Sequence, residues 1–126
     1  MLFRSHILHS MFSETYKQVK KHTLHISHEK SIQTPVLGTN CIHWIVGHIV
    51  VARLNFMMLL DVPSIWDWPT CALFIPGSSP SDESAKKKSI ESILFDLDKT
   101  QNQLAAALEK TSTAGLAKIE IARAHV

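Results

Sequence analysis

The sequence predicts an all-α protein, a single helical bundle with three long helices. Apolar residues recur at helical spacing in three separate stretches of the chain. Four of the five prolines fall within residues 63–80, where they indicate a loop rather than the interior of a helix. No stretch shows the sustained alternation of apolar and polar residues that a strand requires.

Length and composition set the scale of the fold. The 126 residues suit one domain, expected to span 1–126, with 45% apolar and 19% charged residues as in globular proteins. The net charge of +2 is too small to indicate nucleic-acid binding. The basic run Lys86–Lys88 has no interleaved aromatic residues that could stack on bases. We therefore expect no nucleic-acid partner.

The first helix is expected over about residues 4–28. One stripe at helical spacing comprises Leu8, Phe12, Tyr16, Val19, Thr23 and Ile26. Lys17, Lys20 and Lys21 lie off that stripe. His22, His25 and His28 follow at intervals of three, and we expect them to face solvent.

The second helix is expected over about residues 41–61, with Thr39 or Asn40 capping its first turn. At about 100° per residue, His48 falls in the middle of an apolar stripe that we expect to face the core. That stripe comprises Cys41, Trp44, Ile45, Val51, Ala52, Asn55 and Leu59. His43 and Arg53 fall on the opposite side of the helix.

The segment from Cys41 to Leu60 also has the length of a membrane span. Polar residues interrupt it, and an arginine near the middle of a span costs about 2.5–3.5 kcal/mol on insertion scales. The first ten residues contain no uninterrupted apolar run of the kind found in signal peptides, and the two cysteines form no Cys-x-x-Cys pair. We therefore expect a cytoplasmic protein with reduced thiols and no membrane partner.

The third helix is expected over about residues 83–110, following the capping residues Ser81 and Asp82. The long loop at 61–83 that precedes it is rich in apolar side chains, among them Trp66, Trp68 and Phe74. Such side chains are too apolar to stand in water. Two interpretations remain open, a lid over a ligand site or a packed loop that closes the bundle.

Residues 40–53, which read NCIHWIVGHIVVAR, resemble the second helix of DinB-like proteins. An Asn opens that helix, and a Trp-x-x-x-His core follows, here Trp44 to His48. The resemblance extends over roughly residues 5–112, including the aromatic, proline-rich loop. It implies an up-down four-helix bundle, of which this chain would contain the first three helices.

The resemblance also implies a function. DinB-like proteins include metal-dependent transferases and isomerases that use low-molecular-weight thiols. Their zinc or nickel is held by one histidine of the second helix and a His-x-x-x-His pair of the fourth. The position in the second helix corresponds to His48, which the resemblance therefore makes a metal ligand.

The sequence departs from the family after the third helix. No His-x-x-x-His pair occurs from Thr111 onward, and His125 is the only histidine after His48. We therefore expect a shortened reading frame and a metal site that this chain alone does not hold stably. The alternative is a non-catalytic helical module, or truncated remnant, that forms a homodimer through its open apolar face.

Overall fold

The computed structural model describes residues 2–34, 40–79, 83–111, 115 and 117. These residues form helices and loops and no strand, which confirms the all-α prediction. The three long helices are α1 (Leu2–His22), α3 (Ile42–Met58) and α6 (Ile90–Lys110). The shorter elements are α2 (His28–Ser31), α4 (Trp68–Cys71), the 3₁₀ turn η1 (Ala72–Phe74) and α5 (Glu83–Lys86).

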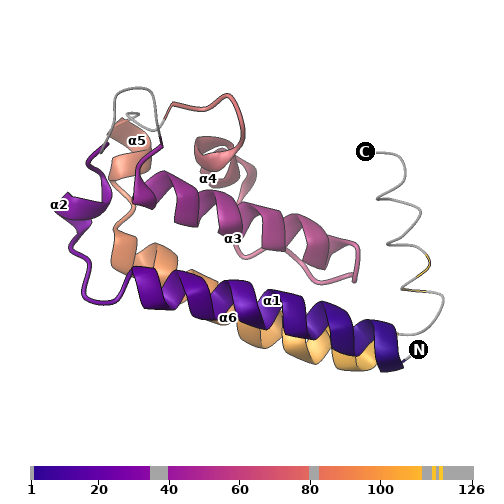
Figure 1. Ribbon diagram of the computed structural model, residues 1–126. Helices are drawn as coiled ribbons and strands as arrows, with labels where there is room; N and C mark the ends of the chain where they lie inside the picture. Colours follow the sequence, from indigo (N-terminus) through magenta and orange to yellow (C-terminus); the bar gives the residue numbers. More distant parts are fainter. Residues whose placement is uncertain (1, 35–39, 80–82, 112–114, 116, 118–126) are drawn as a thin grey trace.

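Both α1 and α3 pack along α6, whereas they approach each other only sparsely (Figure 1). His28 of α2 contacts His43 near the start of α3 and Ile90 at the start of α6. The helices α3 and α6 therefore begin at the same end of the bundle and run parallel, and α1 runs opposite to both. The predicted up-down alternation is wrong for this pair, because residues 59–79 turn back along α3.

The first predicted helix ends earlier than expected. It stops at His22, and residues 23–27 turn before the separate helix α2. The hydroxyl of Thr23 donates to the carbonyl of Val19, and His25 adopts a left-handed conformation with φ of 61°. Ser27 then caps α2 by accepting a hydrogen bond from the amide of Lys30.

The third predicted helix is divided into α5 and α6. Ser89 caps α6, where its hydroxyl accepts a hydrogen bond from the amide of Ser92 at 3.1 Å. The capping residues predicted for this region, Ser81 and Asp82, lie outside the described residues, as does Thr39. Cys41 occupies the cap position of α3 and makes no side-chain capping bond.

The inner face of α3 matches the predicted one only in part. Cys41, Trp44 and Val51 are buried as predicted. His43 and Arg53 are 1% and 2% exposed, whereas Ile45, Ala52 and Asn55 of the predicted inward stripe are exposed. The whole circumference of α3 is apolar, so its pattern does not mark which side meets the core. A histidine and an arginine can be buried there because their polar atoms find partners.

Arg53 connects the three long helices. Its Nη1 donates to Oε1 of Gln101 on α6, and its Nη2 donates to the carbonyl of Phe12 on α1, both at 2.7 Å. Its Nε is buried without a hydrogen-bond partner among the described residues. Burial lowers the pKa of Arg53 to about 10, so the guanidinium remains charged at neutral pH.

Within the described ranges, no helix combines the length and the apolarity needed to cross a membrane.

We predict that the charge of Arg53 contributes little net stability. Arg53→Met keeps most of the buried volume and removes a charge that pairs with no carboxylate of the described residues, so its free energy of unfolding should lie within about 1 kcal/mol of wild type. Arg53→Ala leaves a cavity and should lose about 2–5 kcal/mol. Urea denaturation of both variants measures the difference. Equal losses in the two variants would contradict this prediction.

Candidate functional site

The loop after α3 packs back onto the first turns of that helix, where α4 and η1 lie beside α3 (Figure 1). Nε1 of Trp44 donates to the hydroxyl of Ser78 at 2.8 Å, and that hydroxyl donates to the carbonyl of Ile75 at 2.6 Å. The indole of Trp44 is thereby held with 8% exposure. The first residue of the Trp-x-x-x-His motif thus binds the loop.

Gly47 provides the closest approach between the loop and α3. The ring of Phe74, which is fully buried, lies so near the backbone of Gly47 that a methyl group there would overlap it. Glycine in the middle of a helix is unfavourable by about 1 kcal/mol relative to alanine. Glycine is needed at position 47 because any side chain there would overlap the Phe74 ring.

His48 is bonded to the same loop. Its Nδ1 lies 2.8 Å from the carbonyl oxygen of Phe74. Because a carbonyl only accepts, Nδ1 carries a proton, and in the neutral ring the lone pair is on Nε2. The imidazole also stacks on Trp44, with ring centroids 5.0 Å apart and planes 6° from parallel. One carbonyl and one indole therefore set both the tautomer and the orientation of His48.

The first part of the loop, around Trp66, is bonded to α6. Nε1 of Trp66 donates to Oδ2 of Asp96 at 2.8 Å, and Nζ of Lys88 lies 3.2 Å from the same oxygen. Trp66 and Phe74 are buried, whereas Trp68 is 69% exposed. The packed-loop interpretation is therefore confirmed for Trp66 and Phe74 and wrong for Trp68.

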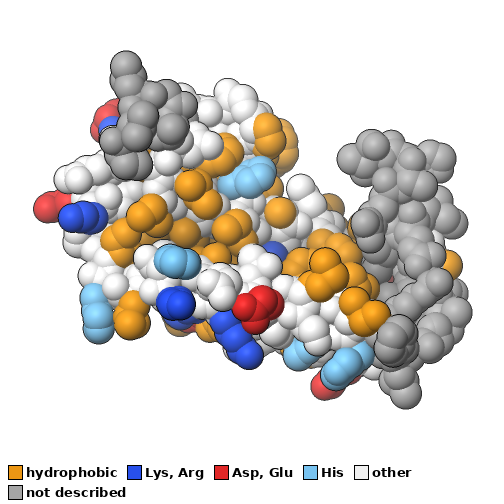
Figure 2. Space-filling model, viewed as in Figure 1, with side chains coloured by type: hydrophobic (Ala, Val, Ile, Leu, Met, Phe, Trp, Pro, Cys, Tyr) orange, Lys and Arg blue, Asp and Glu red, His pale blue; other side chains and the backbone are white. Residues whose placement is uncertain are grey.

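One side of α3 remains uncovered by the described residues. We call this side the outer stripe. Its exposed members are Ile42, Ile45, Ala52 and Asn55, and its half-buried members are Ile49 and Phe56. His48 was predicted to be buried against the first and third helices, but it is half-buried between the loop and the outer stripe. Figure 2 shows further apolar side chains in a band between α1 and α3.

The other histidines are distributed as follows. His22 and His25 are exposed, as predicted, but His28 is half-buried and bonded to α6, so its predicted exposure is wrong. Nowhere in the described part of the chain do three His, Cys, Asp or Glu side chains group so that they could hold a metal. His48 is therefore a single candidate ligand in this part of the protein.

Both cysteine side chains are enclosed by the fold. Cys41 and Cys71 are both free and buried. Burial raises the pKa of the Cys71 thiol, which keeps it protonated at neutral pH.

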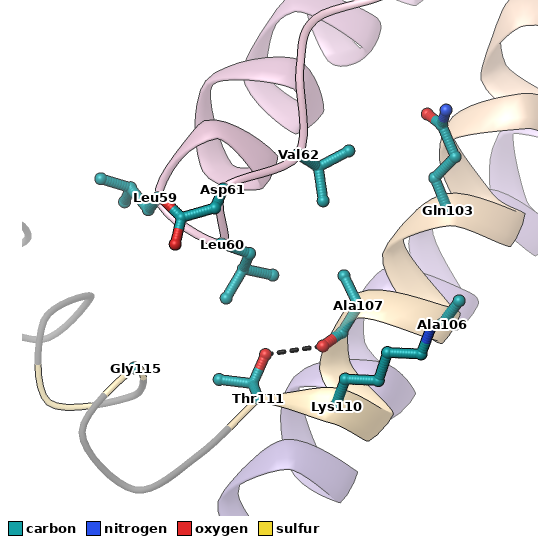
Figure 3. Close-up of a pocket in the computed structure, with 10 residues that line it drawn as sticks. All are labelled: Leu59, Leu60, Asp61, Val62, Gln103, Ala106, Ala107, Lys110, Thr111 and Gly115. Atoms are coloured by element: carbon teal, nitrogen blue, oxygen red, sulfur yellow. Dashed lines mark hydrogen bonds between the residues drawn. The ribbon is translucent and has the colours of Figure 1, made fainter.

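A cavity of about 460 Å³ lies at the opposite end of α3 (Figure 3). Leu60 and Val62 line it from the end of α3, and Ala107 and Lys110 line it from α6. The Thr111 hydroxyl in its wall already donates to the carbonyl of Ala107. His48 does not line this cavity, so the cavity and the candidate ligand are separate features.

The sequence did not reveal the partners that orient the motif. Phe74 and Ser78 follow His48 and Trp44 by 26 and 34 residues, and no spacing rule connects them. The signal that could have indicated a close approach is Gly47, an isolated glycine within an apolar helical pattern.

The chain matches no protein-family model, no curated protein and no solved structure at a significant level. The resemblance of residues 40–53 to DinB-like proteins therefore remains an expectation from the sequence.

We predict that Gly47→Ala destabilises the protein despite the better helix propensity of alanine. The added methyl overlaps the Phe74 ring, and overpacking of this kind costs about 1–3 kcal/mol. The change should be visible as a lower midpoint in urea denaturation.

The matched control is the double variant Gly47→Ala with Phe74→Leu, in which the smaller side chain makes room for the methyl. A double-mutant cycle should show a favourable interaction between the two changes. An increase in stability for Gly47→Ala alone would mean that the ring does not constrain this position.

Proposed function

We propose that the chain is a DinB-like helical-bundle protein in which His48 supplies one imidazole ligand to a divalent metal, zinc or nickel. The observation that carries the proposal is the state of the His48 ring. Its Nδ1–H is donated to the carbonyl of Phe74, and its Nε2 makes no hydrogen bond to another described residue. Histidines that bind metals characteristically donate their second ring nitrogen to a carbonyl or carboxylate in this way.

The remaining ligands would have to come from outside the described residues. His48 borders the outer stripe of α3, so a further helix packed on that stripe could present side chains to Nε2. This helix would be the fourth wall of the bundle, and the apolar character of Ile45 and Ile49 suits such packing. A metal held there would lower the pKa of a bound low-molecular-weight thiol and hold its thiolate for transferase, isomerase or hydrolase chemistry.

The role of this chain's own residues is to orient the ligand. Trp44 and the Phe74 carbonyl fix the His48 ring, and Gly47 allows Phe74 to come close enough to do so. Since one imidazole cannot hold zinc at useful affinity, the purified chain should carry little stoichiometric metal.

Imidazole NMR with a zinc titration tests the ligand position. In ¹⁵N-labelled protein, His48 should show a protonated Nδ1 and a free Nε2, and Nε2 should respond to Zn²⁺ before the exposed His22 and His25. His48→Ala should remove this first response, and His22→Ala should leave it unchanged. If His22 or His25 responds first, or if Nδ1 carries the lone pair, His48 is not the ligand.

A second candidate function is a non-catalytic interaction module that forms a homodimer. The observation in its favour is the outer stripe, where Ile42 and Ile45 are 37% and 43% exposed. Two copies packed through this stripe would bury it symmetrically.

The molecular mass measured by sedimentation or light scattering at several protein concentrations tests whether the chain forms this homodimer. Ile45→Glu should shift the protein toward monomer, because a carboxylate would be buried in the contact. Phe95→Glu is the matched control, since Phe95 is 61% exposed on α6, away from the outer stripe. A monomer at all concentrations, or an equal effect of the two variants, would exclude this mode of association.

A further inference from the structure

Two imidazoles meet where α2, α3 and α6 come together. His28 of α2 and His43 of α3 lie edge to face, with ring centroids 5.4 Å apart and planes at 80°. Both bind the chain at the start of α6, on either side of the capping residue Ser89. Neither histidine belongs to the candidate metal site around His48.

His43 binds the carbonyl of Lys88, the residue before the N-cap of α6. Its Nε2 lies 2.6 Å from the carbonyl oxygen of Lys88, so Nε2 carries a proton and donates it. The ring is 1% exposed and packs against Phe74, with centroids 5.6 Å apart. A proton added to this ring would place a positive charge inside the core without a carboxylate partner among the described residues.

His28 binds the amide of Ile90, the residue after the N-cap of α6. Its Nδ1 accepts a hydrogen bond from the amide of Ile90 at 3.1 Å, which is one of the first amides of α6 and has no partner within the helix. Nδ1 can accept only while it is unprotonated. A proton on Nδ1 would therefore replace this bond with two opposed N–H groups at the positive end of the helix dipole.

We propose that His28 and His43 form an acid-sensitive latch, which fastens the start of α6 to α2 and α3 at neutral pH and opens when the imidazoles are protonated. The latch depends on these two rings and on the Lys88 carbonyl and Ile90 amide that they bind. It does not require that His48 bind a metal.

None of the ion pairs between described residues includes His28 or His43. Nζ of Lys88 is paired with Asp96 and lies over the ring of Trp66. The segment η1 contributes Phe74, which has no charge. The other charged residues of α2 and the first turn of α6 are Glu29, Lys30 and Glu91, all of them exposed.

The direction of the pH effect follows from the buried ring. Burial, together with the neighbouring His28, lowers the pKa of His43 below its ordinary value of 6.5, although the hydrogen bond to Lys88 opposes the shift. The open form therefore takes up a proton more readily than the closed form. The latch is closed above about pH 6.5 and is progressively lost as the pH falls below that value.

Amide hydrogen exchange between pH 7.5 and 5 tests the latch in the unmodified protein. After correction for intrinsic exchange rates, protection of Ile90 and of the α2 amides should fall below about pH 6.5. The direction of this fall follows from the lowered pKa of His43. Amides near Leu104, in the middle of α6, should keep their protection over this range and serve as the internal reference.

Two conservative substitutions separate titration from hydrogen bonding. His28→Asn places an oxygen acceptor near the position of Nδ1, and His43→Gln places an N–H donor near the position of Nε2. In the double variant, the Ile90 amide should keep its protection at pH 7.5, and that protection should no longer fall with acid. His22→Gln, at an exposed position at the end of α1, should behave as wild type. Protection of Ile90 that does not change with pH in wild type, or that still falls with acid in the folded double variant, would overturn the proposal.

Discussion

The close approach of the Phe74 ring to Gly47 is the constraint on which most of the architecture depends. It seats the loop directly on the backbone of α3, which brings the Phe74 carbonyl to His48 and the Ser78 hydroxyl to Trp44. Because the loop is held along α3, the chain returns to the end where α3 began. The helix α6 then starts beside the start of α3 and runs parallel to it.

The number and the approximate places of the long helices could be predicted from the sequence, because apolar spacing and proline positions are local signals. The interruptions near His25 and Ser89 were not predicted. No proline or glycine marks them, and they depend on a left-handed residue and on serine caps. The inner side of α3 was also mispredicted in part, because a helix that is apolar all round gives no preferred direction.

The candidate site was predictable only in part. His48 could be singled out from the motif, but its surroundings depend on contacts between residues far apart in the sequence. Buried His43 and Arg53 were placed on the wrong side because the inward direction of the helix was taken from His48, which the motif had singled out. Both can be buried because the carbonyl oxygens of Lys88 and Phe12 accept hydrogen bonds from them. Such partners cannot be read from spacing.

The pairing of α1 with α6 also bears on how the chain is made. The hydroxyl of Tyr16 donates to Asp98 at 2.6 Å, across 82 positions of sequence, and Lys20 pairs with the same carboxylate. During synthesis, the apolar side of α1 leaves the ribosome long before its main partner exists. At about 5–20 residues per second, this interval lasts several seconds. The apolar side of α1 therefore waits for its partner during this interval, and folding should be slower than in helical proteins whose neighbours in sequence pair first.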